Sequence, residues 1–173
     1  MNNQPKPDEY LYQLDDLKLR TVQIISFALF MGAFSFFAVI ILIYGFTVGE
    51  QSDSSLDDVI LGLTGFTLLT TIVAYPLSYR LFINKLKSSK DAQSFTDNLL
   101  PAYTFRFAVL EGVALLGLTA LLLAVIDNSL SDNLTYWINT LPLLVMALVV
   151  GTNFPTKTKI KLLYEEFVYM RRS

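Results

Sequence analysis

Residues 107–126 read FAVLEGVALLGLTALLLAVI, a stretch of twenty residues in which Glu111 is the only charged side chain. A helix rises about 1.5 Å per residue, so this stretch can cross the ~30 Å hydrocarbon core of a bilayer. Three other apolar stretches have similar lengths. The four predicted spans cover about residues 21–48, 58–80, 102–126 and 134–155. The sequence therefore predicts an all-α, polytopic membrane protein, with the four spans as an up-down bundle in one domain, residues 1–173.

The basic residues lie on one side of this pattern. All thirteen Lys and Arg residues fall in three regions. These are the N-terminal tail, the connection between the second and third spans together with the adjoining span ends, and the C-terminal tail. The connectors after the first and third spans carry only acidic charges. The positive-inside rule then places both termini in the cytoplasm. We expect a multi-pass protein of the bacterial inner membrane, with the lipid bilayer as its surroundings.

Composition excludes several classes of function. The chain has 173 residues, with no His and no Cys, which removes disulfides, thiol nucleophiles, imidazole bases and most zinc sites. It contains no phosphate loop, Gly-rich dinucleotide turn, nucleophile elbow or zinc-protease signature. Four spans with short connectors use nearly the whole chain. We therefore expect no enzymatic activity, no catalytic residue, no cofactor, no metal site and no nucleic-acid partner.

Glu111 is the residue whose side chain is most able to take part in binding or proton transfer. It lies about eight residues into the third span, where a carboxyl group costs about 2.5–3.5 kcal/mol to insert and is expected to face protein or water. Burial disfavours the charged form, so we expect Glu111 to carry a proton much of the time near neutral pH. The polar groups expected to support it, at comparable depth, are Thr67, Thr70 and Thr71 on the second span and Gln23 and Ser26 on the first.

Two interpretations of Glu111 remain open. In one, it binds a proton or a cation in a translocation or sensing path. In the other, it is a structural hydrogen-bonding group that sets the register of packed helices. The second is favoured by the pair Ala108-xxx-Gly112 on the same stripe, because small residues four apart invite another helix.

The predicted inner face carries the basic residues Arg20, Arg80 and Arg106. Arg106 is five residues before Glu111, which turns it about 140° around the helix and makes an ion pair between them poor geometry. We therefore expect the Arg106 side chain to reach out to the headgroups of the inner leaflet.

Two amphipathic segments flank the spans. Residues 156–171 carry Ile160, Leu163, Phe167 and Met170 on one stripe, which predicts a helix on the inner leaflet or under the bundle. Residues 8–19 predict a similar helical lead-in. We expect residues 91–100 to form a loop and Pro101 to begin the third span.

The two hairpins look alike. Each enters at an arginine, Arg20 or Arg106, turns through an acidic connector and leaves through an aromatic-Pro pair, Tyr75-Pro76 or Phe154-Pro155. Duplication of one hairpin would produce this pattern, and so would convergence under the positive-inside rule.

Two resemblances rest on particular residues. Residues 106–115 (RFAVLEGVAL) and 154–160 (FPTKTKI) resemble an uncharacterised group of small four-span bacterial integral membrane proteins. Residues 108–118 (AVLEGVALLGL) are similar to the carboxylate-bearing helix of the rotary ATPase proteolipids. The second resemblance implies that Glu111 binds a proton or a sodium ion.

These observations favour a non-enzymatic membrane protein that acts through helix contacts, as a homo-oligomer or as an accessory subunit of a larger membrane complex. The alternative is a proton- or cation-linked carrier or channel centred on Glu111.

Overall fold

A computed structural model of the chain describes residues 5–47 and 56–170. The elements are α1 (Pro7–Gln13), α2 (Asp16–Thr47), α3 (Asp57–Lys87), α4 (Ala92–Ile126), α5 (Ser129–Asp132), the 3-10 helix η1 (Leu134–Thr140), α6 (Leu141–Asn153), α7 (Lys157–Tyr164) and the π-helical turn η2 (Glu165–Tyr169). Across the described residues the fold is all-α and contains no strand, as the sequence predicts.

Within residues 5–47 and 56–170, four segments are long and apolar enough to cross a membrane: α2, α3, α4 and the continuous segment η1–α6, Leu134–Asn153. The predicted number of long apolar helices is thereby confirmed. The helices extend beyond the apolar stretches: α3 continues to Lys87, and α2 begins at Asp16. Polar helical turns therefore lengthen α2 and α3 beyond their apolar parts.

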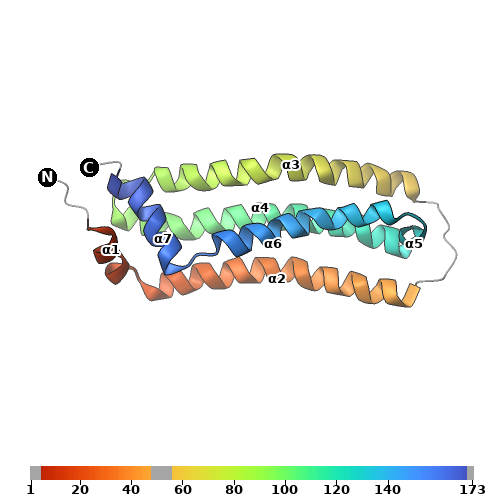
Figure 1. Cartoon of the computed structure of the whole chain (residues 1–173), viewed down its shortest axis with the longest axis horizontal. Helices are drawn as coiled ribbons and strands as arrows, with labels where there is room; N and C mark the ends of the chain where they lie inside the picture. Colours follow the sequence, from red (N-terminus) through yellow and green to blue (C-terminus); the bar gives the residue numbers. More distant parts are fainter. Residues whose placement is uncertain (1–4, 48–55, 171–173) are drawn as a thin grey trace.

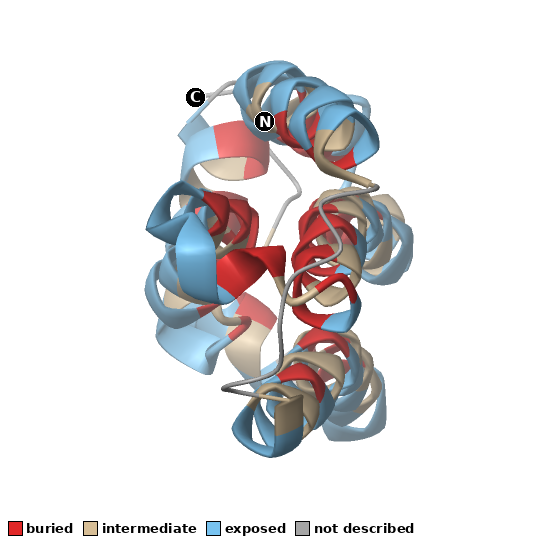
Figure 2. Cartoon of the chain, turned by 90° about the vertical axis from the view of Figure 1, so that its right-hand side faces the viewer, coloured by how far each residue is buried: buried red, intermediate tan, exposed pale blue. Residues whose placement is uncertain are grey.

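Helix α4 occupies the centre of the molecule. It contacts α2, α3, α6 and η1, whereas α2 and α3 lie on opposite sides of the α4–α6 pair (Figure 1). Seen from the end of the bundle, the buried residues gather on the helix faces that point toward this pair (Figure 2). The two helices of the first predicted hairpin, α2 and α3, are thus separated by the two helices of the second, α4 and α6. The packing of the two hairpins therefore gives no support to a duplication.

Small residues allow the other helices to approach α4. Ala114, Ala120 and Ala124 are completely buried along it, next to the larger buried side chains of Phe107 and Leu118. In a membrane, close contact of this kind replaces the hydrophobic effect as the main source of helix association. The sequence of α4 therefore makes it the helix on which the other three can pack.

The closest approach is at Gly117. A Cβ atom placed there would lie 2.5 Å from the backbone oxygen of Asn139 in η1 and 3.1 Å from the Thr67 methyl carbon in α3. Asn139 is fully buried, and its Nδ2 donates to Thr64 Oγ1 at 2.9 Å and to the Tyr136 carbonyl at 3.0 Å. One buried amide thus ties η1 to α3 where both cross α4.

The start of α4 differs from the prediction. The Asp91 carboxylate accepts from the Ser94 backbone N–H at 2.7 Å, and Ser94 Oγ accepts from the Asp91 N–H at 3.0 Å. This capping box starts the helix at Ala92, so the predicted loop at residues 91–100 and the predicted start at Pro101 are wrong. Pro101 lies inside α4, and Arg106 is about 21 Å from the beginning of the helix.

Helices α1 and α7 cover one end of the bundle, called here the α1–α7 end (Figure 1). The rings of Tyr10 and Tyr164 stack with centroids 4.0 Å apart, and Phe95 of α4 meets both edge-on. Lys161 pairs with Asp8. The flanking helices therefore dock under the bundle, which is one of the two placements predicted for the C-terminal helix.

We expect Gly117→Ala to destabilise the fold, because the added methyl group would meet backbone that cannot move aside. Overpacking of this kind costs about 1–3 kcal/mol. Gly62→Ala in α3 is the matched control, since no neighbouring atom lies within 4 Å of the added carbon. Unfolding in detergent micelles, followed by circular dichroism, should show a loss for Gly117→Ala alone; equal stability of the two variants would contradict the packing.

The docking of α1 should depend on pH. Burial raises the pKa of Tyr10 to about 12, and the 3.0 Å hydrogen bond it shares with Thr96 acts in the opposite sense. Because the pKa is raised on folding, the stabilisation is complete below about pH 10 and is lost as the pH rises through about 12. Spin labels on α1 and α7 should separate over this range, and Tyr10→Phe should hold them together to higher pH. The exposed Tyr12 supplies the control, Tyr12→Phe, which should behave like the unaltered protein.

Candidate functional site

Glu111 lies at the rim of the contact between α2 and α4. Its carboxylate is placed against Gly32 of α2, where a Cβ atom would come within 2.9 Å of Glu111 Oε1. The side chain is half-buried. A side chain at position 32 would displace the carboxyl group from this place, and this contact was not anticipated from the sequence.

The open face of α4 begins next to this carboxyl group. Ala108, Gly112 and Thr119 follow one another on one stripe of the helix and are all exposed. No neighbouring atom lies within 4 Å of a Cβ atom placed on Gly112. The small-residue pair noticed in the sequence therefore faces outward and does not take part in the packing of the single chain.

The polar groups predicted to support Glu111 make their contacts elsewhere. Thr70 donates to the backbone oxygens of Phe66 and Thr67, and Thr71 donates to that of Thr67. Ser26 donates to the Val22 carbonyl within α2, and Gln23 Nε2 donates to the Pro155 carbonyl at 2.9 Å. The Thr67 side chain is buried against Gly117. The structure thus brings Gly32 to Glu111 in their place.

The three predicted inner-face basic residues have different environments. Arg20 and Arg80 are exposed, as expected of charges near a membrane surface. Arg106 is only 2% exposed, so the prediction that it reaches out to the headgroups is wrong. The reason is the early start of α4, which carries Arg106 well inside the α3–α4 contact.

Aromatic rings hold the Arg106 guanidinium. Its central carbon lies 5.3 Å from the centre of the Tyr79 ring and 5.0 Å from that of the Phe82 ring, both on α3. Within the described residues, Nε and Nη1 are buried and have no hydrogen-bond partner. An unmatched cation in an apolar bundle is the second chemically distinctive group of the protein.

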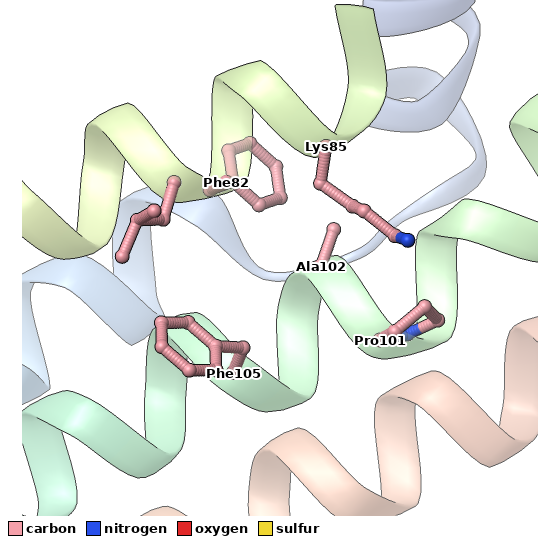
Figure 3. A pocket seen from close by; sticks show the side chains of 6 residues that line it. Phe82, Lys85, Pro101, Ala102 and Phe105 are labelled. Carbon is pink, nitrogen blue, oxygen red and sulfur yellow. The ribbon is translucent and has the colours of Figure 1, made fainter. Parts of the chain in front are cut away.

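A pocket of about 440 Å³ opens beside Arg106. It is lined by Tyr75, Pro76, Tyr79 and Arg80 of α3, Arg106 of α4 and Asn153 of α6. A second pocket, about 260 Å³, lies between α3 and α4 and is apolar except for Lys85 (Figure 3). Of these two pockets, the first is the one in which positive charge and hydrogen-bond donors converge. The presence of Arg106 in the chain was visible in the sequence, but the partners that surround it were not.

Among the described residues, no group of three or more Asp and Glu side chains is placed to hold a metal ion. Comparison with protein-family models, with curated proteins and with solved structures gave no match for the chain. The function is therefore inferred from the chemistry of Glu111 and Arg106 and from the packing of the helices that carry them.

Proposed function

We propose that this chain is a non-enzymatic, multi-pass protein of the bacterial inner membrane that acts through helix contacts as a homo-oligomer. The observation that carries the proposal is the half-buried Glu111 carboxyl group, at the edge of an open face made of small residues. A carboxyl group at this depth requires a partner.

The proposed orientation follows from the charges at the two ends. In the described residues, the Lys and Arg side chains lie toward the α1–α7 end, and the only charged side chains in the connection between α4 and η1 are those of Asp127 and Asp132. The positive-inside rule then assigns the α1–α7 end, with both termini, to the cytoplasm.

A second copy of the chain suits the open face of α4 better than an unrelated helix does. All copies cross the membrane in the same direction, so a two-fold axis along the membrane normal brings identical residues together at the same depth. Gly112 then faces Gly112, which permits close approach. Two protonated Glu111 carboxyl groups can also pair, because each offers one donor and one acceptor.

The alternative function is proton- or cation-linked transport through Glu111. It is favoured by the partial exposure of this side chain, which leaves the carboxyl group accessible from outside the single chain. The two functions differ in what they require of residue 111. Pairing needs a hydrogen-bonding side chain, whereas transport needs a group that gains and loses a proton or binds a cation.

We expect Gly112→Leu to reduce self-association by tenfold or more, because the larger side chain keeps the two α4 helices apart. Gly62→Leu, which also faces open space but on α3, is the control and should associate normally. Sedimentation of the purified protein in detergent micelles measures the association. A monomeric unaltered protein, or equal effects of the two substitutions, would contradict the proposed contact.

Substitution of Glu111 separates the two functions. In the oligomer, Glu111→Gln should retain association, since an amide also donates and accepts, and Glu111→Ala should weaken it. Vesicles containing the unaltered protein should show no proton or sodium flux above empty vesicles. A flux that is present in the unaltered protein and abolished in Glu111→Gln would instead establish transport.

A further inference from the structure

Arg106 is buried at a free-energy cost that the single chain does not fully offset. The side chain is 2% exposed, and the rings of Tyr79 and Phe82 lie 5.3 and 5.0 Å from the guanidinium carbon. Cation–π contacts of this kind offset part of the desolvation. They leave the in-plane N–H groups of Nε and Nη1 unpaired, and among the described residues neither atom has a hydrogen-bond partner. An acceptor from outside the protein could satisfy a buried arginine in this state.

The pocket beside Arg106 supplies space and further donors. Its volume is about 440 Å³, and Arg80, Tyr75, Tyr79 and Asn153 line it together with Arg106. Two guanidinium groups, two phenol hydroxyls and a carboxamide can all donate hydrogen bonds. None of the six lining residues is acidic. The chemistry of the lining therefore matches an anion with several oxygen acceptors.

We propose that this pocket binds a phosphate group, either that of an anionic phospholipid or a soluble phosphate, with Arg106 as the buried anchor and Arg80 at the mouth. A guanidinium group matches phosphate because two parallel N–H groups can meet two oxygens at once. The location fits both sources. Pro76 and Asn153 lie where α3 and α6 approach the α1–α7 end, the end at which the proposed orientation places the headgroups of the inner leaflet.

The apolar pocket between α3 and α4 supplies a matched control. Lys85 is the only charged residue among those that line it (Figure 3). This lysine is exposed and is not among the residues that line the Arg106 pocket. Lys85→Met and Arg106→Met each remove one positive charge near the same end of the molecule. A difference between them therefore reports on the site and not on the overall charge.

The test measures lipid and phosphate binding by the full chain. In mixed micelles, native mass spectrometry should show phosphatidylglycerol retained in preference to phosphatidylcholine by the unaltered protein and by Lys85→Met. Arg106→Met should lose at least tenfold in this binding, and Tyr75→Phe, which removes one phenol donor, should lose severalfold. Equal binding by Arg106→Met and Lys85→Met, or no preference in the unaltered protein, would overturn the assignment unless the phosphate response described next is present.

A second measurement identifies the source of the phosphate group. If the natural ligand is soluble, millimolar inorganic phosphate should raise the unfolding temperature of the unaltered protein and leave that of Arg106→Met unchanged. If the ligand is a lipid, phosphatidylglycerol alone should have this effect. The absence of both responses in the unaltered protein would contradict the proposal.

The stability of Arg106→Met checks the physical premise. Methionine removes the unpaired charge but fills similar space, so without a ligand this variant should unfold at a temperature equal to or above that of the unaltered protein. If the variant does not fold, Arg80→Gln at the exposed mouth provides the binding test, and unchanged phosphatidylglycerol and phosphate binding by that variant would overturn the proposal.

Discussion

The close approach of η1 to α4 at Gly117 is the contact on which the architecture depends. It allows the fourth apolar segment to lie directly against the third, with the Asn139 carbonyl where a larger residue would place a side chain. The Asn139 side chain then bonds to Thr64 of α3. Three helices are thus held together at one level, and α2 packs on the remaining side of α4.

This arrangement gives the two ionisable residues in the centre of α4 opposite environments. Glu111 is placed at the rim toward α2 and next to the exposed stripe of Ala108 and Gly112. Arg106 is turned about 140° from it and is enclosed by Tyr79 and Phe82. The carboxyl group can therefore meet a neighbouring chain, whereas the guanidinium can meet only something small enough to enter a pocket. The proposals for the two residues follow from this difference and are independent of each other.

The candidate site was predictable only in part. Glu111 was identified from the sequence because placing a carboxyl group in an apolar span has a known free-energy cost. Its expected partners Thr70, Thr71 and Ser26 instead donate to carbonyls of their own helices, a local bond always within reach of a hydroxyl side chain. The burial of Arg106 had a signal in the sequence that was not used. Asp91 and Ser94 form a capping box, which starts α4 early enough to bury the arginine.

The sequence by itself determined the helical class, the number of candidate spans and the asymmetry of basic charge, because these follow from residue composition summed along each segment. Only the tertiary structure decided that α4 is central, that its Gly112 face is open and that Arg106 is enclosed. The physical reason is that the buried and lipid-facing sides of a membrane helix are both apolar, so hydropathy carries little information on how each helix is rotated. That rotation is decided by contacts between residues far apart in the chain, such as Gly117 with Asn139 and Glu111 with Gly32.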